Sequence, residues 1–153
     1  MKTARLPLFA LLAASIGLLF EGCTLAVWAR VFNRSGHEIS IRDRDGKTVV
    51  VAPGGNTSLP LWATTKNEER GFVIVDGARE LFYAVRPDTK ADRDDTRFAS
   101  PILPSVSAKT TLHGIEFLFE YGSNSEIYAL VSGTDNPQRA NPQPARFPIK
   151  PTS

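Results

Sequence analysis

Alternation of apolar and polar residues with a period of two is the feature that most constrains the fold of this 153-residue chain. The pattern is clearest in residues 115–121, where Ile, Phe, Phe and Tyr alternate with Glu, Leu and Glu. No stretch after residue 24 sustains apolar residues at the helical spacing of 3.6 over three turns. Successive side chains of a strand point to opposite faces of a sheet, so the pattern indicates strands with one buried face.

Turn-forming residues divide the alternating segments into three predicted hairpins. Gly and Asp favour tight turns, because Gly adopts positive φ without steric cost and an Asp side chain accepts hydrogen bonds from its own turn. The predicted hairpins pair residues 39–42 with 48–52, 72–75 with 81–85, and 115–121 with 126–132. Two further strands are predicted at residues 25–32 and 56–62, and Pro60 restricts the second of these to a sheet edge.

These elements predict an all-β fold, a small antiparallel β-sandwich of about eight short strands, either Ig-like or transthyretin-like. The alternative is an α+β fold with one short helix near residues 64–69. We expect a signal segment in residues 1–22, a sandwich domain in residues 23–134 and a disordered tail in residues 135–153. The tail is predicted from its five Pro residues and its uncompensated basic residues, which favour an extended, unpacked chain.

The N-terminal segment has the features of an export signal. Lys2 and Arg5 precede residues 6–20, which contain no charged side chain and are rich in Leu and Ala. As a helix this apolar run would cover only about 22 Å, which is short of the ~30 Å hydrocarbon layer of a bilayer. We therefore expect the segment to be removed rather than to span the membrane.

The sequence Phe20-Glu21-Gly22-Cys23 resembles the lipobox of bacterial lipoproteins, matching it in Gly22 and Cys23 and departing from it in Phe20 and Glu21. The resemblance implies cleavage between Gly22 and Cys23, and acylation of Cys23, the only cysteine of the chain. Thr24 implies the periplasmic face of the outer membrane. Cleavage after Ala29, which would give a soluble secreted or periplasmic protein, and an uncleaved anchor are the alternatives. No family is recognised in residues 25–153.

Charge and composition disfavour several classes of function. Without Lys2, Arg5 and Glu21, the 18 basic and 16 acidic residues of the chain fall to 16 and 15. A surface so close to neutral argues against a nucleic-acid partner, because binding to phosphates requires a basic patch. The two histidines, His37 and His113, are far apart in the sequence, so no metal and no other cofactor is expected.

No motif in the sequence predicts catalysis, and we expect a protein that is not an enzyme. Glu116 and Glu120 lie four residues apart on one strand face, farther apart than the paired carboxylates of glycosidases. We predict that both face solvent. The charged loop at residues 87–100 does not have the oxygen-ligand spacing of a calcium loop.

These observations predict a lipid-anchored accessory or docking module of the bacterial envelope, held to the membrane by lipid and binding a protein partner. The candidate partner surface comprises Trp28, Phe32, Arg139, Arg146 and Lys150. The alternative for Trp28 and Phe32 is that neighbouring sheets cover both faces of their strand. Two other functions stay open, a periplasmic ligand-binding or inhibitor protein that uses the loop 87–100, and a hydrolase whose site has no recognisable motif.

Overall fold

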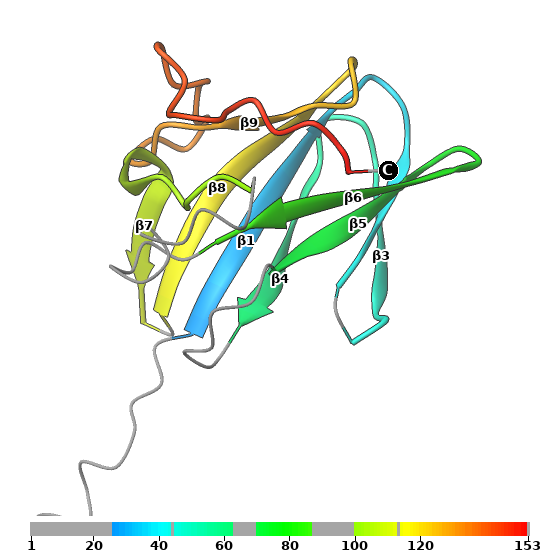
Figure 1. The fold of residues 1–153 in the computed structure, drawn as a ribbon, viewed down its shortest axis with the longest axis horizontal. Coiled ribbons are helices and arrows are strands. Elements are labelled where there is room, and N and C mark those ends of the chain that lie inside the picture. Colours follow the sequence, from blue (N-terminus) through cyan, green and yellow to red (C-terminus); the bar gives the residue numbers. More distant parts are fainter. Residues whose placement is uncertain (1–25, 44, 63–69, 87–99, 113, 153) are drawn as a thin grey trace, which may run out of the picture.

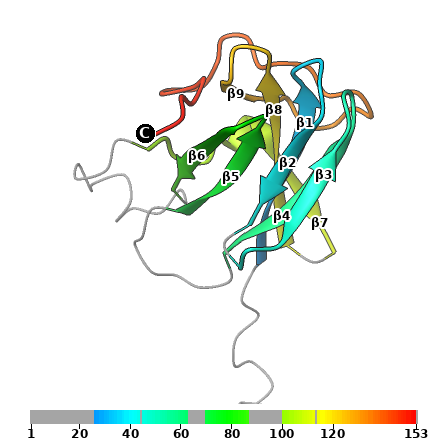
Figure 2. The same cartoon turned by 90° about the vertical axis from the view of Figure 1, so that its right-hand side faces the viewer.

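The fold is a small all-β sandwich, as the sequence predicts (Figure 1). The structure, a computed structural model of the chain, describes residues 26–43, 45–62, 70–86, 100–112 and 114–152. Strands in these ranges form two sheets, seen as separate layers in Figure 2. The strands are β1 (Ala26–Arg34), β2 (Ile39–Arg42), β3 (Thr48–Val51), β4 (Asn56–Trp62), β5 (Arg70–Asp76), β6 (Arg79–Val85), β7 (Ala108–Thr111), β8 (Gly114–Gly122) and β9 (Ile127–Ala129).

The first sheet, sheet A, has the order β4-β1-β8-β7, and β9 also pairs with β8. Its central pair, β1 and β8, is parallel over nine residue pairs, from Ala26 opposite Gly114 to Arg34 opposite Gly122. This pair is the one parallel strand pair among the described strands of an otherwise antiparallel sandwich. β4 lies at the edge of the sheet, so the edge position predicted from Pro60 is confirmed.

The second sheet, sheet B, has the order β3-β2-β5-β6 and is antiparallel throughout. It contains two of the predicted hairpins, β2–β3 and β5–β6. In the first turn the Asp43 carboxylate accepts hydrogen bonds from the backbone N–H groups of Asp45 and Lys47, at 3.0 and 2.9 Å. In the second turn Gly77 has a φ of 62°, the left-handed conformation for which glycine is favoured.

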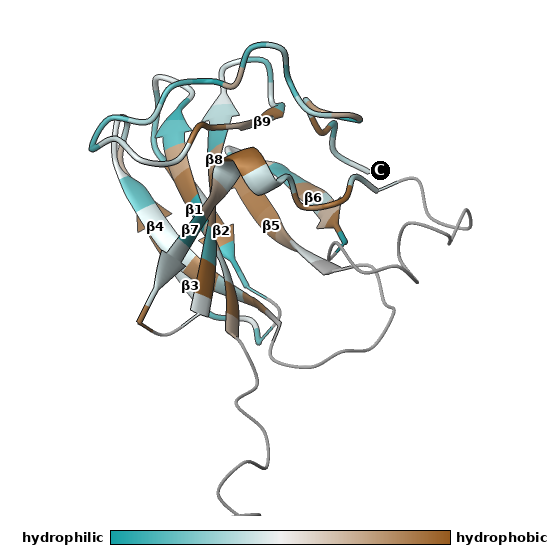
Figure 3. Cartoon of the chain, turned by 90° about the vertical axis from the view of Figure 1, so that its left-hand side faces the viewer, coloured by the Kyte–Doolittle hydropathy of each residue, from teal (hydrophilic) through white to brown (hydrophobic). Residues whose placement is uncertain are grey.

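The hydrophobic core lies between the two sheets. Apolar residues line the inner faces of the strands, while the outward positions are more polar (Figure 3). Phe72 and Tyr83 of sheet B stack with their ring centroids 5.9 Å apart, and Tyr83 meets Tyr121 of sheet A edge to face. Phe117, Phe119 and Tyr121 all belong to this core. The strand at residues 115–121 therefore has the buried apolar face that its alternating sequence predicts.

The C-terminal segment is folded onto the sandwich, and the prediction of a disordered tail from residue 135 is wrong. Ile149 exchanges two backbone hydrogen bonds with Ile127, at 2.8 and 2.9 Å, and Thr152 donates one to Phe82 at 3.0 Å. Phe147 stacks on Phe119 with ring centroids 5.9 Å apart. The Pro residues limit regular pairing, but the buried apolar side chains between them supply enough contact to hold the segment in place.

The structure differs from the predicted strands at β7 and β9. β7 was not predicted, because Ala-Lys-Thr-Thr contains no apolar alternation, and a short 3-10 turn, η2 (Ser105–Ser107), precedes it. The third predicted hairpin is present as β8 and β9, although β9 is shorter than residues 126–132. The alternative helix at residues 64–69 and the charged loop at residues 87–99 lie outside the described residues.

Candidate functional site

The outer face of sheet A carries an unusual arrangement of charged and aromatic side chains. The parallel register of β1 and β8 places Trp28 opposite Glu116, and Phe32 opposite Glu120. Residues at alternate positions share a face, so two arginines of β1 lie between and beyond the aromatic residues. The outward side chains of the two strands are Trp28, Arg30, Phe32 and Arg34 on β1, and Glu116, Leu118 and Glu120 on β8.

Glu116 and Glu120 are buried, and the prediction that they face solvent is wrong. Glu116 is 5% exposed and accepts hydrogen bonds from Arg30 Nε at 3.1 Å and Ser58 Oγ at 2.7 Å. No local sequence pattern indicates this environment, because each arginine lies diagonally across a strand pair that joins distant parts of the chain. A charged carboxylate can be buried when hydrogen-bond donors and an opposite charge satisfy it. The arginine partners therefore explain why Glu116 and Glu120 can be buried.

Glu120 is the centre of the most highly charged part of this face. It is 2% exposed, and its two carboxylate oxygens bind different guanidinium groups. Arg34 donates to one oxygen from Nη1 at 3.0 Å, and Arg139 donates to the other from Nε at 2.7 Å. The Arg139 guanidinium also lies over the Tyr128 ring, with its carbon 3.6 Å from the ring centroid. We call Arg34, Glu120, Tyr128 and Arg139 the Glu120 cluster.

Within the Glu120 cluster two guanidinium groups share one buried carboxylate, and next to the cluster the Glu126 carboxylate accepts a hydrogen bond from Tyr128 Oη at 2.8 Å. The arginine side chains are 33% and 47% exposed, so both remain accessible to solvent while they bind Glu120. They line an open depression of about 630 Å³. Its other lining residues are Glu120, Tyr128, Gln138, Ala140, Asn141 and Gln143.

Donors in the C-terminal segment help to fix the shape of this depression. The Gln143 side chain accepts a hydrogen bond from the Ala129 N–H and donates to the carbonyls of Ala129 and Ala140. Gln138 and Asn141, whose side chains also carry amides, are exposed. Arg34 also donates to the side-chain oxygen of Asn136 and to the carbonyl of Pro137. The arrangement can therefore bind a carboxylate or another hydrogen-bonding anion, because it combines guanidinium and amide donors in one depression.

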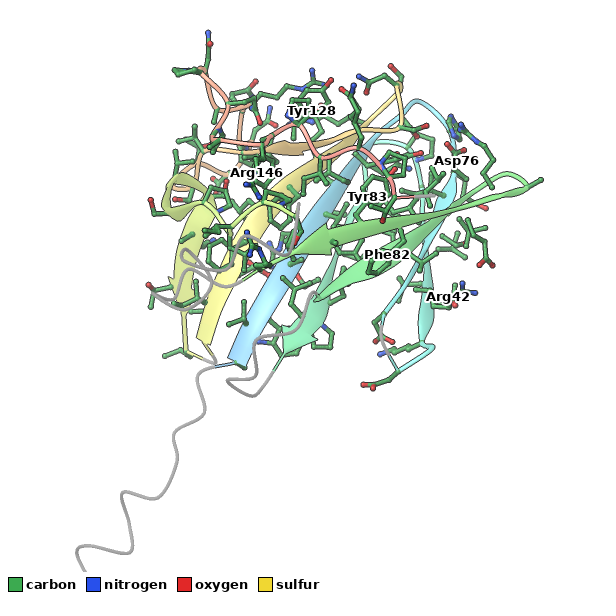
Figure 4. All side chains as sticks on the ribbon, viewed as in Figure 1. Arg42, Asp76, Phe82, Tyr83, Tyr128 and Arg146 are labelled. Atoms are coloured by element: carbon green, nitrogen blue, oxygen red, sulfur yellow. The ribbon has the colours of Figure 1, made fainter. Side chains whose placement is uncertain are left out.

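The structure divides the predicted partner surface between two places. Trp28 and Phe32 are half-buried on the outer face of sheet A, and Arg139 belongs to the Glu120 cluster. Arg146 and Lys150 instead line a second depression, of about 350 Å³, beside Ala84 of β6 (Figure 4 labels Arg146). Gly22 and Cys23, the residues of the predicted cleavage and lipidation, lie outside the described residues.

A second polar network surrounds Asp76 at the end of β5. Asp76 is 8% exposed, and its carboxylate lies 2.6 Å from His37 Nε2 and accepts hydrogen bonds from Tyr121 Oη at 2.6 Å and Arg79 Nη2 at 2.7 Å. Burial alone would raise the pKa of the Asp76 carboxyl. The hydrogen bonds from Tyr121 and His37, together with the charges of His37 and Arg79, outweigh burial and hold this pKa below its usual value.

The hydrogen bonds of the Asp76 network extend through two buried tyrosines. Burial, followed by the hydrogen bond to Asp76, raises the pKa of Tyr121, so this hydroxyl remains a proton donor. Tyr83 donates in the same region to the Ser125 carbonyl at 2.8 Å, and Figure 4 shows Tyr83 and Asp76 in neighbouring positions. The network thus joins β5, β6 and the β8–β9 turn through satisfied hydrogen bonds.

The described residues give no positive indication of a metal site or of a membrane-spanning helix. Across residues 26–152, with their gaps, no group of three or more His, Cys, Asp and Glu side chains could hold a metal ion. In the same part of the chain no helix has the length and hydropathy needed to cross a bilayer. The acidic residues of the outer face act instead as counterions to arginines.

Comparison with known proteins identified no relative. No protein-family model, no curated protein and no solved structure matches the chain. The site is therefore defined by its own geometry. Of the Glu120 cluster, the sequence predicts only Arg139 as a partner-surface residue, and Arg34 and Tyr128 are not among the predicted site residues. A usable indication was the equal spacing of Arg30 and Arg34 on one strand and Glu116 and Glu120 on another.

Proposed function

We propose that this protein is a lipid-anchored, non-enzymatic docking module of the bacterial envelope, located at the periplasmic face of the outer membrane. In this proposal acylated Cys23 holds the domain to the membrane, and the Glu120 cluster binds a protein partner. The observation that carries the proposal is the course of β1. This strand begins three residues after Cys23 and ends at Arg34, within the Glu120 cluster.

The length of β1 separates the two ends of the module. Nine residues at ~3.3 Å per residue place Arg34 about 26 Å along the strand from Ala26. The Glu120 cluster would therefore lie well away from the lipid surface, where a partner can reach it. Because β1 is central in sheet A, with β4 and β8 on its two sides, the separation is set by a rigid element.

The chemistry of the cluster favours an acidic partner segment. Arg34 and Arg139 together carry one more positive charge than Glu120 neutralises, and each guanidinium keeps part of its surface exposed. A carboxylate of the partner could accept hydrogen bonds from these guanidinium groups and from the neighbouring amides. Hydrogen bonds between guanidinium and carboxylate groups are charge-assisted and therefore stronger than those between neutral groups. Tyr128, already positioned beneath Arg139, would supply apolar contact area at the same place.

The proposal can be tested by site-specific photocrosslinking in intact envelopes. A photoreactive amino acid replaces Gln138, which lines the depression, in the full-length protein, and a second variant carries it at Ala78 in the β5–β6 turn, outside the lining of the depression. We expect a discrete protein adduct from position 138 and a different pattern, or none, from position 78. Both replaced residues are exposed, so the two variants are matched.

Charge reversal then tests whether the cluster is responsible for the adduct. Arg139→Glu adds a second carboxylate to the cluster, beside Glu120, where it would repel the acidic partner segment, and should abolish the adduct at position 138. Lys150→Glu makes the same charge change in the other depression and should leave the adduct unchanged. An adduct that persists in Arg139→Glu but disappears in Lys150→Glu would show instead that the partner binds at the depression lined by Arg146 and Lys150. Identical adducts from positions 138 and 78 would contradict a localised docking surface.

A further inference from the structure

We infer that the turn between β7 and β8 inserts Leu112 into the lipid surface beside the anchor, which fixes how the domain stands on the membrane. This inference rests on the lipid anchor of the proposed function. Leu112 is 100% exposed, whereas the other exposed large hydrophobic residues among those described range from 38% to 59%. A fully exposed leucine at the tip of a turn has no packing role inside the domain.

The position of the turn provides the first argument. Gly114, which follows the turn, is paired with Ala26, the first residue of β1. The two backbones are so close that a Cβ atom on Gly114 would lie 2.0 Å from the Ala26 carbonyl oxygen. The turn and the start of β1 are therefore side by side at one end of the sandwich, which Figure 1 shows at the foot of β1 and β8.

The length of the chain provides the second argument. Three steps of ~3.8 Å separate the Cα atoms of Cys23 and Ala26, so an acylated Cys23 would hold Ala26 within about 11 Å of its own position at the lipid surface. Leu112 is two residues from Gly114 and thus lies within reach of the same surface. A domain on a long linker would not be constrained in this way.

The structure of the turn provides the third argument. Thr111 is paired with Gly114, and its hydroxyl donates to the Gly114 carbonyl at 3.1 Å, so the two strands are held together up to the turn. Lys109, three residues before Leu112, is exposed and can contact anionic headgroups. An apolar tip with a nearby cation matches the chemistry of a phospholipid surface, where apolar burial and headgroup attraction act together.

The test places a fluorescent probe next to Leu112 in the lipidated protein. Thr110→Cys, an exposed position, is labelled with an environment-sensitive dye, and the full-length product is reconstituted into vesicles of phosphatidylethanolamine and phosphatidylglycerol that contain a nitroxide-labelled lipid. Acylation leaves position 110 as the only free thiol, because Cys23 is the only native cysteine. Ala78→Cys, in the β5–β6 turn, is the matched control.

We expect several-fold stronger quenching by the nitroxide lipid at position 110 than at position 78. In the Leu112→Ser background, quenching at position 110 should fall several-fold toward the level of position 78, because the anchor alone keeps this end near the lipid without inserting the turn. Equal quenching at the two positions, or strong quenching at position 110 that survives Leu112→Ser, would overturn the inference. Failure of the anchor itself has a separate result: the chain would not float with the vesicles, and Cys23 would accept the dye in protein that has no added cysteine.

Discussion

Asn33 shows how one buried polar residue organises the end of the sandwich. Its side-chain amide donates to the carbonyls of His37 and Val51, at 2.7 and 2.9 Å, and its side-chain oxygen accepts from Ser35. Its backbone exchanges hydrogen bonds with Gly54 and Gly55. A single side chain with 0% exposure thus connects β1, the turn after it and β3. Without this side chain the Val51 carbonyl would lose its Asn33 donor, and the N–H and hydroxyl of Ser35 would lose their shared acceptor.

Replacing Asn33 should destabilise the protein much more than replacing Asn56, the first residue of β4. We expect Asn33→Ala to lower the free energy of unfolding by about 2–4 kcal/mol, because buried carbonyls lose their donor. Asn56 has the same residue type but is exposed, and Asn56→Ala should change stability by no more than ~0.5 kcal/mol. Urea denaturation of both variants measures the difference, and equal losses would contradict the central role of Asn33.

Asp76 should make stability depend on acid pH. Its pKa is lower in the folded protein than the value of ~3.9 typical of an unfolded chain, so its stabilising contribution is present above about pH 4. This contribution is lost as the pH falls through the folded pKa, because the unfolded chain binds the proton first. The stability difference between wild type and Asp76→Asn, followed by urea denaturation at decreasing pH, should therefore narrow below about pH 4.

The exposed Glu80 provides the control for this pH dependence. Its pKa is also lowered, first by the hydrogen bond from Arg42 and then by the arginine charge, but the pair is in contact with solvent. Added salt should suppress the contribution of the Glu80 charge to the free energy of unfolding. Most of the contribution of Asp76 should remain, because salt screens buried charge pairs less than exposed ones. A wild-type acid dependence that disappears in salt, or that survives unchanged in Asp76→Asn, would contradict the prediction.

At the level of elements, the C-terminal segment behaves as part of the core. Ile149 pairs with Ile127 of β9, and Phe147 packs on Phe119 of β8, so the segment covers residues from two strands of sheet A. Thr152 then reaches Phe82 on β6, the edge strand of sheet B. The segment therefore joins the two sheets on one side of the sandwich.

Truncating a buried side chain of this segment should destabilise the whole domain. We expect Phe147→Ala to lower the free energy of unfolding by about 3–5 kcal/mol, as for other buried aromatic residues. Lys150→Ala, three residues later and exposed, should change it by no more than ~0.5 kcal/mol. Thermal or urea unfolding of the two variants tests this difference. A tail that acted only as a flexible arm would give small effects in both.

The sequence predicted those elements whose evidence is local. The β2–β3 and β5–β6 hairpins follow from adjacent strands and a turn containing Gly, so a short window contains all the information. The pairing of β1 with β8 could not be predicted in this way, because Arg30 and Glu116 are 86 residues apart and no local pattern relates them. The Glu120 cluster depends on that pairing and on the position of Arg139. The sequence therefore predicts only one of its members, Arg139, as a partner-surface residue.

At the level of the whole molecule, the proposed anchor leads to a simple test of location. We expect Cys23→Ser to release the protein from membranes or to stop its processing, because the acyl chains that bind it to lipid cannot be attached. Thr24→Ser, the neighbouring conservative change, should leave the protein in the membrane fraction. Fractionation of the envelope and analysis of the mature N-terminus measure both outcomes. A wild-type chain that begins at Arg30 and is soluble would contradict the anchor.

The parallel pairing of β1 with β8 also determines when the protein can finish folding. β1 is made first, but one of its two edges pairs only with residues 114–122, near the end of the chain. Contacts between distant residues form slowly, because closing a long loop costs entropy before any hydrogen bond is gained. β4 can cover the other edge of β1 earlier, and until β8 arrives the first strand keeps an unpaired edge at which a partly made chain is open to misassembly.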